Sequence, residues 1–565
     1  MIEQQQTAWW RGGLILALLL AFGLMIALPL GLLPLDIALQ DQDRVGLLRG
    51  LLADPSLRHA VSRTLGVAVL ACAVASVVAV PLALLATRSA TPTRWLIGAL
   101  GVLPLIMPAF LTAALARHLG IVFDPSTLAD PVGESGPAGN AAVLIIVFAM
   151  HYFPVILFSL IASLAKIDRS LEESARNLGA GTPVVWRRVI LPLAAPGYLM
   201  GVALVLLRIL EDAATPLVLG VDDMLAPQLL LRLGQADPSD PQLRIIAVVL
   251  LLVSALFAAL AWSALLPCAT ETPIYRRQPA RWPAGAANTV LPIVPLLALA
   301  VIALLPIAWL TLLALGIHWP ATLPPGGVPS GDLPGMFHDQ LPGLGTSIGY
   351  VGLSGALTGV VCWAFAAADA ARGLLARVAR FLSTAMFAVP GVVLALAYLN
   401  LAERFGRPLA DTPGQAWLAL ALVVALKQAP LAHRLISWRI RELHPGGFEA
   451  AHQLGATRTV RLLRVTLPAL AGALGALFLL GAAAGLVELS AALLLIRDPA
   501  APYAVVLFNG IRSGSDPALW AVQGMALVTA VGLAVAAAAA LIRGRSTVQQ
   551  SFSHGGQSAE TRHEG

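Results

Sequence analysis

Three ionisable side chains fall within about one helical turn of an apolar segment that runs from Leu206 to Pro216. Arg208, Glu211 and Asp212 lie at spacings i, i+3 and i+4, so a helix would place them on one face, where opposite charges attract. Ionisable residues inside a membrane span are costly and often functional. The spacing leaves two interpretations open: a neutralised ion pair near the outer end of a span, or a charged element of a pathway or gate.

A second apolar segment carries a matching acid. Glu488 in "LVELSAALLL" corresponds to Glu211, but no arginine lies three residues before it, so the two segments differ in charge. We interpret His151, Lys427 and His433 as interfacial or helix-packing residues. The sequence contains no paired catalytic residues, H-E-x-x-H pair, nucleophile elbow or cofactor fingerprint, so we predict no catalytic, metal or cofactor site in this chain.

A polar, basic stretch of twenty residues occurs twice. "ESARNLGAGTPVVWRRVILP" begins at Glu173 and "EAAHQLGATRTVRLLRVTLP" begins at Glu449, and ten of the twenty positions are identical without a gap. A solvated loop need only be polar, whereas these copies keep Glu, Ala, Gly and Leu-Pro at the same spacing. Small side chains at Ala175, Ala450 and Ala451 allow close approach of a partner's surface. We therefore predict that both stretches are docking elements.

The first copy has the signals of a helix, a turn and a second helix. Ser170 and Glu173 have the spacing of a capping box, and Gly179 stands where a left-handed residue would end a helix. We expect a short helix over about residues 170–178, then a basic helical segment "TPVVWRRV". Pro192 can occupy the first turn of the helix that re-enters the apolar region.

Composition shows what surrounds these residues. Of the 565 residues, 58% are hydrophobic and 12% are charged, against about 25% charged in soluble domains. We therefore predict an all-α polytopic membrane protein. Hydropathy predicts six spans in each half, with the first one retained, at residues 11–34, 59–87, 95–118, 141–165, 194–220 and 243–268, then 289–317, 345–370, 380–403, 415–438, 469–496 and 518–543.

The chain contains an internal repeat. Corresponding pairs lie at offsets of 276 to 283 residues: Thr64 with Ser347, Pro108 with Pro390, Pro154 with Pro430, and Glu211 with Glu488. Six spans separate the two polar stretches, so the repeat is parallel and both stretches emerge on one face. We predict a first half at 1–268, a cytoplasmic linker at 269–288, a second half at 289–545 and a disordered tail at 546–565.

Basic loops set the expected orientation. Arginines follow the predicted second, eighth and twelfth spans, and no Lys or Arg occurs from Trp282 to Ala371. Both termini should then be cytoplasmic. The net charge of +6 is dispersed beside spans with no aromatic-interleaved patch, so we predict lipid contact and no nucleic acid. Cys72, Cys268 and Cys362 lie far apart, which indicates buried packing.

Both polar stretches resemble the EAA motif of binding-protein-dependent ABC importer permeases: E-A-A, three residues, Gly, nine residues, an aliphatic residue, one residue, Leu-Pro. The motif residues are Glu173, Ser174, Ala175 and Gly179 in one copy and Glu449, Ala450, Ala451 and Gly455 in the other. Ser174 replaces an alanine, and Val189 and Val465 replace the usual isoleucine. In that family the motif forms a coupling helix that sits in a groove of a cytoplasmic ATPase.

The resemblance implies one ATPase contact per half, hence two ATPase subunits, and a periplasmic or lipid-anchored substrate-binding protein. The chain has only two lysines, and neither belongs to a P-loop, so ATP must be hydrolysed by a separate subunit. The fused form looks like permeases for ferric iron, our first expectation for the cargo, or for thiamine or 2-aminoethylphosphonate. A major-facilitator secondary transporter, also with twelve spans in parallel halves, is the alternative from another class.

Overall fold

The computed structural model describes most of the chain in ten ranges. These are residues 16–35, 54–119, 136–234, 240–265, 293–317, 333–407, 413–442, 450–457, 467–496 and 501–560, without positions 18, 90, 372 and 452, together with residues 409, 460 and 464–465. The predicted linker at 269–288, Glu449 and Cys268 lie outside the described residues. Throughout the described ranges the regular elements are helices, as expected for segments that must satisfy their own backbone hydrogen bonds in lipid.

The first half is a bundle of long apolar helices joined by short ones. After an apolar helix at Leu19–Leu35, it contains α3 (Pro55–Arg88), α4 (Thr91–Ile106), α5 (Ala109–His118), α6 (Gly136–Leu164), α7 (Arg169–Asn177), α8 (Thr182–Val185), the π-helix η1 (Trp186–Ile190), α9 (Leu191–Glu211), α10 (Ala214–Val218), α11 (Leu225–Leu233) and α12 (Pro241–Leu265). Helix α6 packs between α3 and α9.

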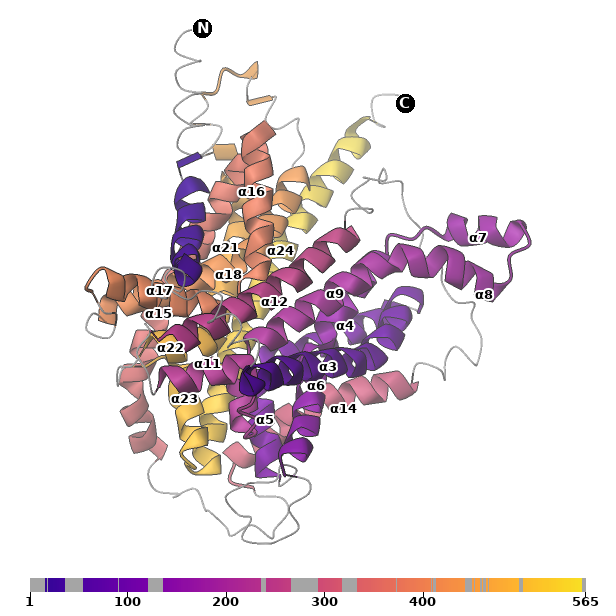
Figure 1. The fold of residues 1–565 in the computed structure, drawn as a ribbon. Helices are drawn as coiled ribbons and strands as arrows, with labels where there is room; N and C mark the ends of the chain where they lie inside the picture. The colour runs from indigo at the N-terminus through magenta and orange to yellow at the C-terminus, as the bar shows by residue number, and fades with distance from the viewer. Residues whose placement is uncertain are drawn as a thin grey trace.

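The second half repeats this order. It contains α14 (Ile293–Ala314), α15 (Leu333–Ala371), α16 (Gly373–Ala385), the 3-10 helix η3 (Met386–Ala388), α17 (Gly391–Arg404), α18 (Pro413–Glu442), α21 (Leu467–Val487), α22 (Ser490–Leu495), α23 (Tyr503–Arg512) and α24 (Pro517–Glu560). In Figure 1 the two halves form bundles whose helices run in different directions. The all-α fold with two parallel repeats is confirmed.

The first helix of each half packs on the opposite half. Phe22, in the helix at Leu19–Leu35, meets Phe365 of α15 edge-on at a centroid distance of 5.0 Å. The Tyr398 hydroxyl of α17 donates to the carbonyl oxygen of Met25 at 3.0 Å. Helix α14 in turn contacts α3, α4 and α5 of the first half. The halves are therefore interlocked through their first helices.

Two predicted spans are broken. The helices on either side of Pro108 meet at 79°, and those on either side of Pro390 meet at 99°. Proline has no N–H to donate and disfavours helical backbone at the residue before it, and Val389 is accordingly extended. The spans predicted at 95–118 and 380–403 thus correspond to two bent helix pairs, and the bends at the two prolines were not predicted.

Spans five and eleven end earlier than predicted. Helix α9 ends at Glu211 and α21 at Val487, and each is followed by a short separate helix. Across the described residues, nine helices are long and apolar enough to cross a membrane, or eleven when each bent pair is one span, beside the shorter helix at Leu19–Leu35.

The repeat extends to single hydrogen bonds. The Thr64 hydroxyl accepts from the Leu225 N–H at 3.0 Å, and the Ser347 hydroxyl accepts from the Tyr503 N–H at 2.8 Å.

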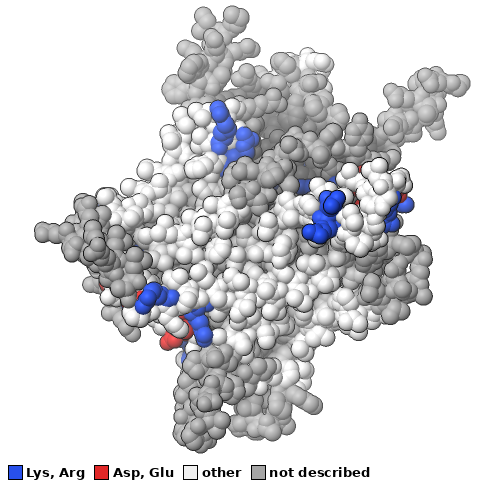
Figure 2. Space-filling view, turned by 45° about the vertical axis from the view of Figure 1, so that its right-hand side comes forward, with Lys and Arg blue, Asp and Glu red and all other residues white. Residues whose placement is uncertain are grey.

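Surface and termini complete the fold. The face in Figure 2 is largely uncharged, with charged side chains confined to a few places, as a lipid-facing surface requires. Cys72 and Cys362 are buried and unbridged, so the prediction of packing roles is confirmed for these two. Helix α24 continues through residues 546–560, a segment for which composition predicts disorder.

Candidate functional site

The first docking stretch forms the expected helix and turn. Helix α7 begins after Asp168, whose carboxylate accepts the Ser170 N–H at 2.9 Å, so Asp168 is the N-cap and the predicted capping box at Ser170 is wrong. Gly179 has φ 84°, in the left-handed region. The Ala180 N–H donates to the Ala175 carbonyl oxygen at 3.0 Å, which closes a Schellman turn.

The second docking stretch closes in the same way. Gly455 has φ 74°, and the Ala456 N–H donates to the Ala451 carbonyl oxygen at 3.0 Å. The Leu454 N–H donates to the Ala450 carbonyl oxygen at 3.0 Å, as Leu178 does to Ser174 at 3.1 Å. The two copies therefore share one turn geometry, which the glycine spacing predicted.

The same apolar positions are exposed in both copies. Leu178 is 88% exposed and Leu454 is 86% exposed, each directly before the left-handed glycine. Val184 and Val460, also matching positions, are exposed as well. The two copies therefore expose the same two apolar positions. Sequence reasoning singled out the small residues of the motif and missed these larger ones, although the two leucines are identical in the two copies.

The acidic residues of α7 have different roles. Glu173, the first motif residue, is exposed and pairs with Arg169 at 2.6 Å, one turn earlier. The neighbouring Glu172 is buried and accepts from both terminal nitrogens of Arg88, at 3.2 and 2.5 Å. Ser174 is exposed and Ala175 is half-buried. Sequence reasoning missed the buried pair because Arg88 and Glu172 belong to different elements.

The stretch after each turn contains π-helical backbone. In the first half η1 covers Trp186–Ile190 between α8 and α9. In the second half residues 464–465, at the matching place, also have π-helical hydrogen bonding. The predicted helical segment "TPVVWRRV" is thus continuous with the following span, and Leu191-Pro192 falls where this π-helix passes into α9. Such insertions are frequent at functional sites.

The charged residues inside the spans form one network between the halves. Arg208 donates to Glu211 at 2.8 Å, so the predicted local pair forms. The second carboxylate oxygen of Glu211 lies 3.1 Å from the Lys427 ammonium, which also contacts Glu488 at 2.7 Å. Lys427, Glu211 and Glu488 are each close to nine-tenths buried. The network therefore links α9 of the first half with α18 and the end of α21 in the second.

Backbone groups at the helix breaks complete the network. The Gly391 N–H, directly after the Pro390 break, donates to Glu211 at 3.2 Å. Glu488 also accepts the Ala491 N–H at 3.2 Å, at the start of α22. The Ser490 hydroxyl accepts the Ala213 N–H from the other half at 3.3 Å. The break at Pro390 and the short helices α10 and α22 thus contribute to the contact between the halves.

Asp212 does not pair with Arg208. Its two carboxylate oxygens accept the Thr215 N–H at 3.0 Å and the Thr215 hydroxyl at 2.7 Å, and so stabilise the first turn of α10. Lys427, which we predicted to be an interfacial or packing residue, instead carries the central positive charge. The sequence signal for it was a lysine within an apolar span. Sequence spacing alone did not reveal which acids it meets.

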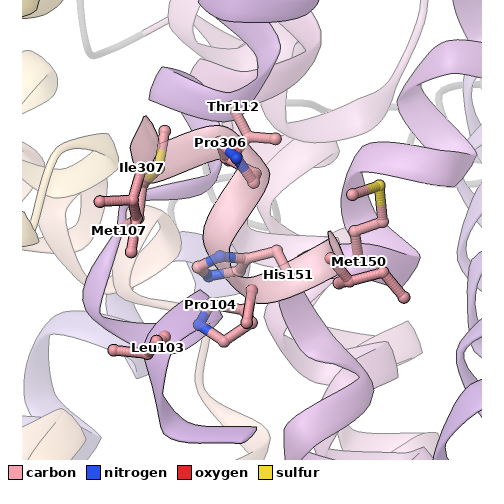
Figure 3. A pocket seen from close by; sticks show the side chains of 10 residues that line it. Leu103, Pro104, Met107, Thr112, Met150, His151, Pro306 and Ile307 are labelled. Atoms are coloured by element: carbon pink, nitrogen blue, oxygen red, sulfur yellow. The ribbon is translucent and has the colours of Figure 1, made fainter. Parts of the chain in front are cut away.

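The two histidines differ. His433 meets the Ser383 hydroxyl through Nδ1 at 2.7 Å and stacks on Phe365, as predicted for a packing residue. His151, at the position matching Lys427, lines a small cavity between the halves (Figure 3). Residues from α4, α5 and α6 and from α14 form this cavity. Among the described residues, no group of three His, Cys, Asp or Glu side chains is placed to hold a metal ion.

Comparison with known proteins decides the family. Residues 79–267 and 359–545 each match the family described as binding-protein-dependent transport system inner membrane component. The chain belongs to this family. The two matches fall in the two repeats, so the chain is a fused, multi-pass permease of two halves, and members of this family are transport subunits of ABC importers.

Two relatives fit this family. The chain is 30% identical over 218 residues to a probable molybdenum ABC transporter permease protein of Haloferax volcanii, a match that covers 37% of this chain and 74% of the relative. It is 39% identical over 69 residues to the spermidine/putrescine transport system permease protein PotB of Haemophilus influenzae, covering 12% of this chain and 24% of that protein. The family match therefore supports an importer permease and not a major-facilitator carrier.

Proposed function

We propose that this chain is the membrane subunit of an ABC importer in which each half docks one ATPase subunit. The observation that carries the proposal is the matched pair of turns at Gly179 and Gly455, each with an exposed leucine before it. Their shared geometry fits two copies of one partner, a symmetric ATPase pair. The chain itself binds no cofactor, and ATP is used by the partner.

The transport pathway runs between the halves, and the charged network closes it. Glu211 and Glu488 come from different halves and are held together by Lys427. Opening a passage there requires the Glu211–Lys427 contact to break. A gate of this kind has two packed arrangements, inward-open and outward-open. ATP binding and hydrolysis by the partner subunits, transmitted through the docking helices, selects between them. Asp212 acts at the same place by holding α10.

The membrane orientation follows from the loop charges. The basic loops support an orientation in which both docking stretches and both termini are cytoplasmic, with halves at 1–268 and 289–545 joined by a linker at 269–288. The opposite face then receives the cargo from a periplasmic or lipid-anchored substrate-binding protein. The membrane is the bacterial inner membrane.

We propose ferric iron as the cargo, with thiamine and 2-aminoethylphosphonate as the alternatives. The fused two-half architecture supports this order. The relatives named above carry molybdenum and polyamine transport in their names, so the family serves more than one class of solute. In this family the binding protein selects the cargo, which is consistent with a gate made of paired charges and no ligand cluster.

Reconstitution tests both levels of the proposal. The chain is co-expressed with candidate ATPase and binding-protein subunits from the same genome and placed in proteoliposomes. We expect the ATPase to co-purify and its activity to rise when the binding protein is loaded with ferric iron. Stimulation by a thiamine-loaded or phosphonate-loaded protein alone would replace the cargo. A chain that retains no ATPase would overturn the permease proposal itself.

A further inference from the structure

Arg88 connects three elements at one end of the first bundle. It is the last residue of α3, and only 9% of it is exposed. Two guanidinium nitrogens donate to the two carboxylate oxygens of Glu172 in α7. The guanidinium carbon lies 5.0 Å from the centre of the Trp186 ring, in η1. A forked arginine–carboxylate contact fixes orientation as well as distance, and the ring adds a cation–π contact.

Helix α7 buries little of its own surface. Glu172 is the one buried residue among its nine, and Leu178 directly after it is almost fully exposed. A helix of this length is marginal on its own and gains stability in proteins by packing, and the apolar packing of α7 is limited to the half-buried Ala175. The position of α7 relative to the spans is therefore set largely by Arg88.

The aligned positions of the second half carry apolar residues, and two of them, Phe448 and Leu462, lie outside the described residues. At the offset of 276 residues that relates the docking stretches, Phe448 stands at the position of Glu172 and Leu462 at the position of Trp186. At the offset of 283 that relates Thr64 to Ser347, Ala371 stands at the position of Arg88. None of these three side chains can form an ion pair.

We propose that Arg88 is a positioning residue that makes α3, α7 and η1 move as one body, and that only the first of the two docking stretches has this link. Movement imposed on α7 by an ATPase subunit then reaches α3 directly. In the second half, movement passes along the chain into α18 and α21 without an ion pair. The two ATPase contacts are thus mechanically unequal. This inference rests on the proposed docking function.

Matched spin labels test the link in the full-length chain. One pair joins Val77 of α3 to Asn177 of α7, and the other joins the corresponding Val360 of α15 to Gln453; all four positions are exposed. We expect a narrow distance distribution for the first pair and a broader one for the second. Arg88→Gln or Glu172→Gln should broaden the first pair to the width of the second, and the exchange R88E/E172R should narrow it again.

The second measurement is the stimulation of ATPase activity by the binding protein, in the complete transporter. Glu172→Gln should keep the ATPase bound but reduce stimulation by the binding protein about fivefold or more, and the exchange should restore it. Arg63→Gln, which breaks an ion pair with Asp223 at the other end of α3, is the control and should stay within about twofold of wild type.

The outcomes separate the two levels of inference. Unchanged first-pair distances in both single variants, or an exchange that leaves them broad, would overturn the link. If Arg88→Gln does not insert into the membrane, Glu172→Gln and the exchange still decide the matter. A wild-type chain that binds no ATPase but gives the expected distances would remove the proposed function and leave the mechanical link standing.

Discussion

Lys427 carries a charge that the spans could accommodate only with partners. Its ammonium contacts Glu211 and Glu488 at 3.1 and 2.7 Å, and its alkyl chain occupies the space that a side chain at Gly391 would need, because a Cβ there would lie 2.7 Å from Lys427 Cδ. Glycine at position 391 therefore leaves room for the Lys427 side chain beside the broken span, so that its ammonium contacts both acids. Ala109, at the matching place in the first half, faces no such lysine, since His151 replaces it.

Removing the charge of Lys427 should lower the free energy of unfolding, because the buried carboxylates lose their shared cation. Lys427→Met leaves Glu488 without its cation, and breaking a buried pair in this way costs about 3–5 kcal/mol of unfolding free energy. The double variant K427M/E488Q should recover part of that loss, because Glu211 keeps Arg208 and the Gly391 N–H. Thermal unfolding of the purified chain in detergent measures both.

Arg404→Gln, on the exposed end of α17, is the control for the lysine change and should shift stability by no more than about 0.5 kcal/mol. An unfolding midpoint for Lys427→Met equal to that of the control would contradict the central role of this charge.

Residue contacts could be predicted from sequence only where both partners share an element. The i, i+3 spacing correctly predicted the pair Arg208 and Glu211. It did not exclude Asp212 as a partner, because spacing does not show that Asp212 begins a new helix. The contact of Lys427 with Glu488 joins residues 61 apart, and that of Arg88 with Glu172 joins residues 84 apart. Such contacts depend on how helices pack.

At the scale of elements, the turn after each docking helix is the most specific feature. Both turns need a left-handed residue, and both place glycine there with φ of 84° and 74°. An L-residue in that conformation costs about 1–2 kcal/mol, and a β-branched one is worse. No atom lies within 4 Å of the position that a Cβ would take at either glycine, so the requirement comes from the backbone and not from crowding.

Valine at either glycine should therefore open its turn and misplace the exposed leucine beside it. We expect Gly179→Val or Gly455→Val to reduce co-purification of the ATPase and ATP-driven transport together, while the chain still inserts. Gly181→Ser is the control: this residue has φ −66° at the N-cap of α8, where serine is favoured. Full transport by the double glycine variant would remove the coupling assignment.

The sequence predicted that the helices and turns exist better than it predicted where the helices bend. Apolar length predicted the nine helices that are long enough to cross a membrane among the described residues, and the glycine spacing predicted both turns, because each signal is local. The bends at Pro108 and Pro390 were missed although both prolines were recognised as a repeated pair. Prolines also lie inside α6 and α18, at Pro154 and Pro430, without ending either helix. Whether a proline breaks a span depends on the neighbouring helices that satisfy its freed carbonyl groups.

The whole molecule is one unit built from two interlocked halves. Each first helix packs on the opposite half, and the charged network, the Ser490–Ala213 contact and the cavity at His151 all lie between the halves. Fusion into one chain keeps the two halves at a one-to-one ratio. It also lets their sequences diverge, as the different partners of Glu211 and Glu488 illustrate. Two halves of different sequence can still bind a symmetric pair of ATPase subunits if their docking surfaces stay alike.

The complete complex should then hold two ATPase subunits for each chain, one at each docking stretch. Leu178→Asp or Leu454→Asp places a charge on an exposed apolar contact, and each change should lower the stoichiometry from two ATPase subunits to one, because a buried unpaired charge disfavours binding. The double variant should retain none. Native mass spectrometry of the purified complex gives the ratio directly. Phe405→Asp, at a 71% exposed apolar residue beyond the docking stretches, is the control and should keep two. Loss of both subunits in a single variant would show that the ATPase pair binds all-or-none, whereas no loss in the double variant would exclude these leucines as the docking contacts.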